Sequence, residues 1–353
     1  MAVLAGPAVA APGSAPPAAT APACAGPVVK LQPLGAGRWG VLAHDGDADE
    51  GNRGQVSNLV LLRDGRRLWL LGSGPSPAFG RALACQVRQQ LGLRVTDVVS
   101  PWARPELVLG VAGLGPVRHW AHAEVADAMA EQCPHCVDRL RQRLQGAADD
   151  LGPDPISLPD HRLHGSSGSL GPLRWWRLLR SAGRVVTVWR LPGPPLWLAP
   201  GLLGGDAPPD GRDADFAMLR QSAAQLRSLA AADGEAARFI GEQGAPQDAR
   251  AAARLQAYWS TLLQQVGAAI ERGDLDSAAP SSWPAMPPGW AVHPWHALNW
   301  QRGWRQIEPE VLAGVGAGGA PSAPAPAAGA ASLPGQSSPA APVQRGGFQR
   351  SLR

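Results

Sequence analysis

The chain has 353 residues, 45% of them hydrophobic, which is enough to enclose a substantial core in one large domain or two small ones. Its formal net charge is +4, and the basic side chains, all arginine except Lys30, are scattered along the sequence. Nucleic-acid binding calls for a basic face with stacking aromatic side chains, so we expect no nucleic-acid partner. No run of eighteen or more apolar residues occurs, so we also expect no membrane span.

The two ends of the chain differ in composition from its middle. Residues 1–27 are rich in Ala and Pro and carry no charged side chain. They resemble the end of a secretory signal and a flexible spacer, although the usual basic leading region is missing; the alternative is a disordered tail on a cytoplasmic protein. Residues 313–353, rich in Ala, Gly, Pro and Ser, are predicted to be disordered. The folded domain is therefore expected to span residues 28–312, beginning with one or two strands over Val28–His44.

The next stretch of the chain predicts an α/β unit. Two apolar runs, Val56–Leu62 and Leu68–Leu71, flank an Asp-Gly dipeptide that favours a tight hairpin. A helix follows, because apolar residues recur at three- and four-residue spacing in Phe79, Leu83, Val87 and Leu91. Arg94–Val99 is the next strand, and it opens into a loop. Units of this kind place functional residues in the loops beyond the strand ends.

The second half of the chain mixes helices and strands. Pro116–Gln145 is predicted to be mostly helical, with an interruption at Pro134, and Gly146–Gly171 is predicted to be loop-rich. Further strands are predicted over Leu173–Leu179, Arg184–Leu191, Leu196–Leu198 and Arg238–Ile240. Further helices are predicted over Asp213–Leu229, Pro246–Gly273 and Trp295–Pro309.

Two segments of the α/β unit match the motifs of a known family. Residues 70–74 (Leu-Leu-Gly-Ser-Gly) and 101–110 (Pro-Trp-Ala-Arg-Pro-Glu-Leu-Val-Leu-Gly) fall on its strand-end motifs without a gap. The chain thereby resembles the metallo-β-lactamase superfamily, in particular an exported bacterial branch found alongside quinoprotein dehydrogenases. The resemblance covers roughly Gly37 to Val311, and residues 296–304 are similar to the branch's C-terminal helix. It implies an α/β fold, the four-layer αββα sandwich.

The scaffold residues of these motifs match the family, but its metal ligands do not. The ligand positions fall here on Trp102, Arg104, Glu106, Leu107, Arg180, Leu202 and Gln243, with Glu242 as the other choice for the last. Indole and aliphatic side chains offer zinc no lone pair. An arginine beside a divalent ion costs roughly 8 kcal/mol at 4 Å with an effective dielectric constant of about 20. We therefore expect no metal and no other cofactor at the family's site.

The resemblance, combined with these losses, gives two functional hypotheses. The first is a catalytically degenerate protein that acts as a binding or accessory protein in the cell envelope, periplasmic or secreted, with a small anion or a protein as partner. The second is a hydrolase of the same fold with an altered or relocated metal site, which would hold zinc. A cytoplasmic location is the alternative to export.

Two of the substituted ligand positions suggest an anion site. The family's fold brings Arg104 and Arg180 to one spot, and Glu106 would neutralise only one of them. The surplus charge would then hold a carboxylate or phosphate through bidentate hydrogen bonds. In the alternative, both arginines turn outward and Trp102 and Leu107 fill the space as core.

A relocated metal site could use His119, His122, Cys133 and Cys136, since two His and two Cys can form a tetrahedral zinc site. The alternatives are structural thiols, a local disulfide or a redox-active pair. We predict that Cys133 and Cys136 lie on an outer helix away from the family's site, and that replacing both with Ser leaves the fold intact. Cys24 and Cys85 have no partner nearby in the sequence.

Overall fold

The computed structural model describes residues 24–35, 37–44, 46–205, 207–274, 286–287, 289–290 and 292–318. The chain divides into two units, Met1–Leu312 and Ala313–Arg353, and the fold below is that of the first. The predicted disordered tail lies outside the described residues beyond position 318.

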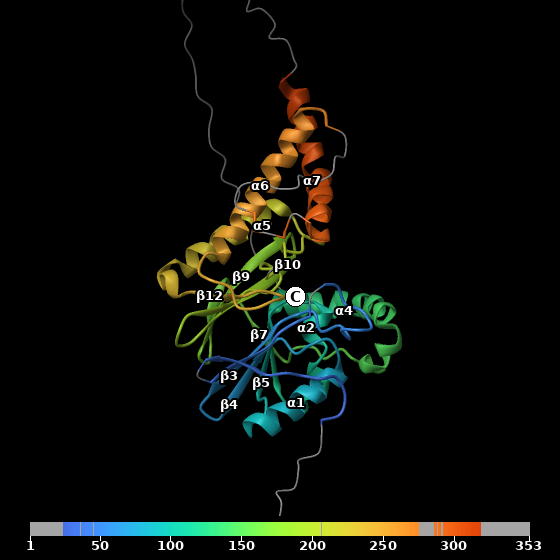
Figure 1. Cartoon of the computed structure of the whole chain (residues 1–353), viewed down its shortest axis with the longest axis vertical. Coiled ribbons are helices and arrows are strands. Elements are labelled where there is room, and N and C mark those ends of the chain that lie inside the picture. Colours follow the sequence, from blue (N-terminus) through green and yellow to red (C-terminus); the bar gives the residue numbers. More distant parts are fainter. Residues whose placement is uncertain are drawn as a thin grey trace, which may run out of the picture. The chain divides into compact units, whose positions relative to one another are not determined.

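Two β-sheets form the centre of the first unit (Figure 1). The first sheet has strand order β1-β2-β3-β4-β5-β6-β7, antiparallel from β1 to β4 and parallel from β4 to β7. Its strands are β1 Gln32–Gly35, β2 Arg38–Val41, β3 Leu59–Asp64, β4 Arg67–Leu71, β5 Asp97–Ser100, β6 Arg118–His122 and β7 His161–Leu163. The second sheet has the order β12-β11-β10-β9-β8. Its strands are β8 Ser167–Leu170, β9 Leu173–Ser181, β10 Arg184–Leu191, β11 Leu196–Leu198 and β12 Arg238–Ile240.

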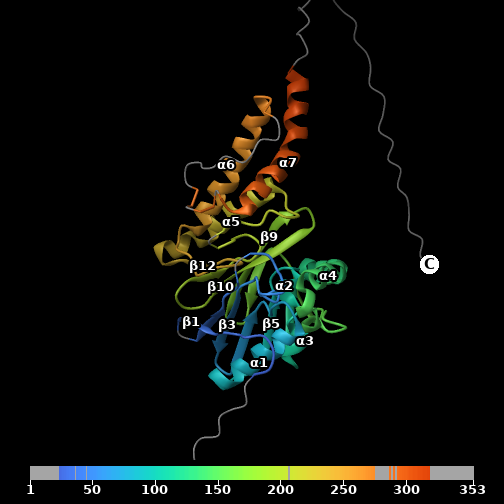
Figure 2. The same cartoon turned by 45° about the vertical axis from the view of Figure 1, so that its right-hand side comes forward.

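Three apolar cores separate four layers. Because side chains alternate along a strand, Leu59 and Leu61 of β3 pack against the helices α1 and α4, while Val60 and Leu62 face the second sheet. The outer face of the second sheet packs against α5 and α6 through residues such as Trp197 and Phe239. Figures 1 and 2 show the resulting order of helices, sheet, sheet and helices. The predicted fold class, a four-layer αββα sandwich, is confirmed.

The helices begin and end where local chemistry favours it. Helix α1 (Pro77–Leu91) starts after Ser76, whose side chain accepts a hydrogen bond from the main chain of Phe79, and it ends at Gly92 in the left-handed conformation. The other helices are α2 Pro105–Val108, α3 Val111–Leu114, α4 Ala123–Leu144, α5 Phe216–Ala230, α6 Ala251–Glu271 and α7 Pro294–Gly318, with 3₁₀ turns at Gln145–Leu151 and Ala231–Ala236. None of the helices in the described ranges is long and apolar enough to cross a bilayer.

Three predictions of secondary structure were wrong. Arg118–His122 forms strand β6 rather than helix, because its main chain is parallel to both β5 and β7 and bonds to them. Pro134 lies inside α4 without ending it. Ser167–Leu170, expected to be loop, pairs with β9 as β8; main-chain bonding holds it, and its small polar side chains gave no strand pattern.

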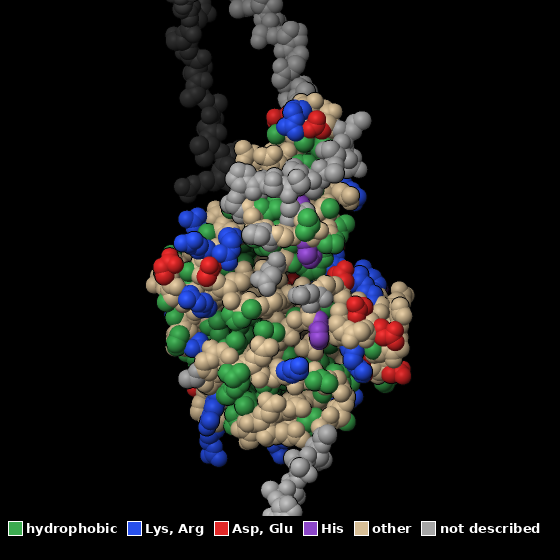
Figure 3. Space-filling view, viewed as in Figure 1, with side chains coloured by type: hydrophobic (Ala, Val, Ile, Leu, Met, Phe, Trp, Pro, Cys, Tyr) green, Lys and Arg blue, Asp and Glu red, His purple; other side chains and the backbone are tan. Residues whose placement is uncertain are grey.

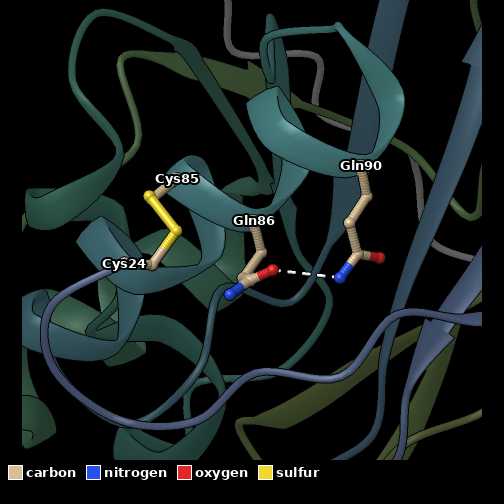
Figure 4. Close-up of a disulfide and its surroundings, with 4 residues drawn as sticks. All are labelled: Cys24, Cys85, Gln86 and Gln90. Atoms are coloured by element: carbon tan, nitrogen blue, oxygen red, sulfur yellow. Dashed lines mark hydrogen bonds between the residues drawn. A yellow bond between two sulfur atoms is a disulfide. The ribbon is translucent and has the colours of Figure 1, made fainter. Parts of the chain in front are cut away.

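A disulfide joins Cys24 to Cys85 of α1, across 61 positions of sequence (Figure 4). The two cysteines have no partner nearby in the sequence, and the fold brings them together. Figure 4 also shows the next polar residues of the helix, where the Gln90 side chain donates a hydrogen bond to Gln86. Cys133 and Cys136 are free thiols. The disulfide therefore fastens the segment before β1 to the outer helical layer.

Candidate functional site

A cavity of about 440 Å³ lies beyond the ends of strands β5 and β9. Its walls come from the loop and short helix α2 after β5, from α4, from the facing ends of β9 and β10, and from the loop before α5. The loop after β5 is fixed to the second sheet, because the main chain of Thr187 donates a hydrogen bond to Pro101 O at 2.8 Å. Figure 3 shows basic and acidic side chains next to one another along the flanks of one face of the molecule.

The floor of the cavity is built on the Arg104 guanidinium. Its Nε donates a hydrogen bond to Glu106 at 3.2 Å, its Nη1 donates to Glu242, and the same Nη1 lies 3.8 Å from Asp210 Oδ2. All four residues are buried, with at most 8% of their surface exposed. Three carboxylates from three separate segments therefore surround one buried cation.

Burial and the neighbouring charges shift the pKa values of Arg104, Asp210 and Glu242 in different directions. Burial alone would lower the pKa of Arg104, but the charges of Glu242, Glu106 and Asp210 raise it above its ordinary value. Burial alone would raise the pKa of Asp210, but the charges of Arg104 and Arg212 lower this pKa below its ordinary value. For Glu242, burial dominates and raises the pKa in spite of Arg104.

Trp102 makes cation–π contacts with both Arg104 and Arg180. The guanidinium carbons of Arg104 and Arg180 are 5.3 and 4.5 Å from the centre of the Trp102 ring. Arg180 donates hydrogen bonds to main-chain oxygens of Gly201, Asp210 and Arg212. The pKa of Arg180 is lowered to about 10, chiefly by burial and also by the positive charge of Arg104, while Asp210 and Glu242 oppose the shift. Its donors are thus used to hold the loop before α5 in place.

Helix α7 positions the loop that carries Asp210. The side chain of Asn299 donates to Pro209 O at 2.8 Å and accepts from the main chain of Gly211 at 3.1 Å. A Cβ atom at Gly211 would lie 2.5 Å from the Asn299 oxygen, so only glycine allows this approach. The segment that resembles the family's C-terminal helix therefore contributes to the site through this loop.

Positive charge without a carboxylate partner lies at the rim of the cavity. On the floor, Arg104 and Arg212 form ion pairs with carboxylates, and Arg180 donates to main-chain oxygens. At the rim, Arg139, Arg143 and Arg184 form no ion pair within the described part of the chain. Arg184 donates only to the Gln132 amide, at 2.9 Å. Glu131 and Asp213 line the same rim.

Four of the residues that the resemblance placed at the site do line the cavity: Trp102, Arg104, Glu106 and Arg180. Leu107 and Leu202 are buried in the hydrophobic cores instead. Gln243 turns away and donates to the main chain of Gly46 and Val56, so Glu242 is the residue of that segment that reaches the site.

Both expectations for the two arginines need correction. Arg104 and Arg180 do not turn outward, since only 8% and 2% of their surface is exposed. The floor also has no surplus charge, because Asp210 and Glu242 join Glu106 around Arg104. Asp210 and Arg212 were not foreseen; their only signal was the alternation of charge in Asp210-Gly211-Arg212-Asp213.

The four residues of the proposed relocated zinc site do not converge, because each of them has different neighbours. His119 Nε2 is 2.7 Å from Ser100 Oγ, and His122 Nε2 is 3.0 Å from Gly165 O. Cys133 is buried in the core beneath α4. Cys136 lines the cavity with His135, so the prediction that both cysteines lie away from it was wrong for Cys136.

The described residues also do not fit a metal at the family's site. They contain no group of three or more His, Cys, Asp or Glu side chains arranged to hold a metal ion. The three carboxylates that converge on the floor are ion-paired with the Arg104 guanidinium, which lies among them. An ion placed there would have to displace a covalently attached cation.

Solved structures that are similar to this chain include metallo-β-lactamases. They include FIM-1 from Pseudomonas aeruginosa in its mono-zinc form (17% identity, TM-score 0.53, covering 68% of this chain and 97% of that one). The enzymes from Hirschia baltica (13%, 0.50, 66% and 97%) and Erythrobacter litoralis (17%, 0.53, 66% and 96%) are similar to the same extent. No protein-family model and no curated protein matches the chain. The chain has the metallo-β-lactamase fold.

Proposed function

We propose that this protein is a non-hydrolytic binding protein that takes a small anionic ligand in the cavity beyond β5 and β9. The observation that carries the proposal is the Arg104 guanidinium, enclosed by Glu106, Asp210 and Glu242 where the resemblance puts the metal. This arrangement offers neither a metal-activated water nor a lone-pair donor set for zinc. Binding, rather than metal-dependent hydrolysis, is the chemistry that remains.

The rim gives the expected class of ligand. Arg139, Arg143 and Arg184 present guanidinium groups without carboxylate partners in the described ranges, and such groups recognise carboxylates and phosphates by paired hydrogen bonds. The cavity volume of about 440 Å³ falls within the range of small-molecule sites. A compact organic acid or phosphate ester has the size and charge to fit.

The proposal extends to the cell envelope, as a periplasmic or secreted accessory protein, with a quinoprotein system as the candidate partner from the resemblance alone. The Cys24–Cys85 disulfide supports export, because such bonds persist in oxidising compartments.

Calorimetry and metal analysis test this function together. We expect purified protein to bind citrate or inorganic phosphate, and the Arg139→Gln/Arg184→Gln variant to bind about tenfold more weakly or worse, since charge-assisted bonds are lost. Arg227→Gln is a matched control, because Arg227 is exposed on α5 and donates only to the Gln256 amide. Equal binding by rim variant and wild type would overturn the proposal. Stoichiometric zinc with hydrolytic turnover would establish the alternative, a hydrolase with an altered metal site.

A further inference from the structure

Two thiols of unlike environment lie on α4 beside the cavity, in the segment Cys133-Pro134-His135-Cys136. Cys136 is partly exposed and lines the cavity with His135. Cys133 is fully buried beneath the same helix. The pair therefore has one thiol that a ligand in the cavity can reach and one that it cannot.

The two sulfur atoms also differ in their contacts, because Cys136 has a polar neighbour and Cys133 lies in the core. Arg139 Nη2 donates a hydrogen bond to Cys136 Sγ at 3.2 Å, so this sulfur contacts a guanidinium at the rim of the cavity. Burial, and to a smaller extent the adjacent Cys136, raise the pKa of Cys133 to about 12. Cys133 is thus a protonated thiol at rest, held next to its partner.

The helix places these sulfurs within reach of each other. Residues three apart on a helix have Cβ atoms about 5–6 Å apart, which is roughly 1–2 Å more than a disulfide allows. Pro134 lies between the cysteines and has no N–H group, so this turn of α4 lacks one of its helical hydrogen bonds. The helix therefore has one main-chain hydrogen bond fewer beside the two cysteines that must approach each other to form a disulfide.

We propose that Cys136 and Cys133 form a dithiol that reduces a small anionic disulfide bound in the cavity. The ligand class rests on the proposed function, because the rim arginines Arg139, Arg143 and Arg184 would hold its carboxylates. The bound disulfide is itself the oxidant, so the step needs no further redox partner.

The exchange proceeds in two balanced steps. The Cys136 thiolate attacks one sulfur of the ligand; the other sulfur leaves with the bonding electron pair and takes up a proton, which gives a mixed disulfide on Cys136. Cys133 then loses its proton and attacks Cys136 Sγ, and the second ligand thiolate leaves and is protonated. One disulfide is reduced to two thiols, and the two cysteines are oxidised to one disulfide.

The experiment uses the full chain, with Cys136 and Cys133 reduced and the Cys24–Cys85 bond checked by mass spectrometry. The probe is the dianionic disulfide dithiobis(nitrobenzoate), and neutral dithiodipyridine is its counterpart. Wild type should release two probe thiolates per chain and end two hydrogens lighter, with no probe attached. Cys133→Ala, which keeps a small apolar side chain in the core, should release one probe thiolate and retain the second half of the probe as a mixed disulfide on Cys136. Cys136→Ser should release none while folded.

The charge of the ligand is tested with the same probes. Arg139→Gln should slow the anionic probe about tenfold and the neutral probe much less, because only the former interacts with the rim. Probe left on both cysteines of wild type, or reaction of Cys136→Ser at the wild-type rate, would overturn the dithiol and leave the binding function standing. Equal effects of Arg139→Gln on the two probes would overturn the anionic ligand class, which both proposals share.

Discussion

Arg104 is the residue on which the candidate site depends. It pairs with Glu106 and Glu242 and lies close to Asp210, and all of them are nearly inaccessible to water. A buried ion pair contributes little net stability compared with an apolar core, but removal of one partner leaves the others as uncompensated buried charges. Loss of the Arg104 guanidinium would therefore leave three buried carboxylates without their shared cation, whereas loss of one carboxylate would leave Arg104 with two.

Replacing Arg104 with Gln should lower the free energy of unfolding by about 3–5 kcal/mol, because three buried carboxylates lose their cation. Without Arg104, the pKa values of Asp210 and Glu242 rise in the folded state, so the deficit relative to wild type should shrink as the pH falls and these two side chains become protonated. Urea denaturation at several pH values measures this. Arg63→Gln on the exposed hairpin is the control, and a deficit below 1 kcal/mol at neutral pH would contradict the prediction.

His119 should make stability depend on pH. Burial lowers its pKa to about 4, partly opposed by Asp160, whereas the unfolded chain has the ordinary value of about 6.5. The unfolded state thus binds the extra proton first, and stability present above pH 6.5 should fall by about 3 kcal/mol as the pH approaches 4. Thermal unfolding across this range, compared with His119→Gln, isolates the contribution. An unchanged pH profile in the variant would show that His119 is not its source.

At the scale of elements, the second half of the chain acts on the site through α7. Asn299 bonds to Pro209 O and to the main chain of Gly211, and its amide also donates to the Tyr258 hydroxyl at 3.1 Å. This side chain joins α7, α6 and the loop of Asp210 into one network. The loop has no regular secondary structure of its own, so its conformation depends on these bonds.

The Asn299→Ala variant should lose about 2–3 kcal/mol of stability, since it leaves the buried main-chain groups of Pro209 and Gly211 without the Asn299 side chain. Hydrogen exchange of the Gly211 amide should accelerate more than that of the sheets, because the loop opens locally. Gln301→Ala, on the exposed face of the same helix, should change stability by no more than about 0.5 kcal/mol. Similar losses in the two variants would refute the role of Asn299.

The sequence was most informative where side-chain pattern determines structure. The apolar runs predicted β9, β10, β11 and β12, and the motif register placed Trp102, Arg104, Glu106 and Arg180 together. It was least informative where main-chain pairing decides, as in β6 and β8. Asp210 could not be predicted, because it reaches the cavity only through the contact between α7 and an irregular loop.

For the whole molecule, the Cys24–Cys85 disulfide closes a loop of 61 residues that includes strands β1 to β4 of the first sheet. In the chain-entropy model a crosslink across a loop of this length stabilises the fold by about 4 kcal/mol, because it restricts the unfolded chain. The Cys24→Ser/Cys85→Ser variant should unfold correspondingly earlier in denaturant, with an unchanged far-ultraviolet spectrum at low denaturant. An unfolding midpoint equal to that of wild type would show that the crosslink does not stabilise the fold.

The guanidinium at the centre of the floor also changes how the protein depends on its surroundings. A metal ion exchanges with the solvent, and its occupancy follows the supply of that metal and the chelators competing for it. Arg104 is supplied by translation, in fixed stoichiometry, and cannot dissociate. The positive charge at the centre of this site is therefore part of the polypeptide and does not have to be taken up from the environment. The site is complete as soon as the protein has folded.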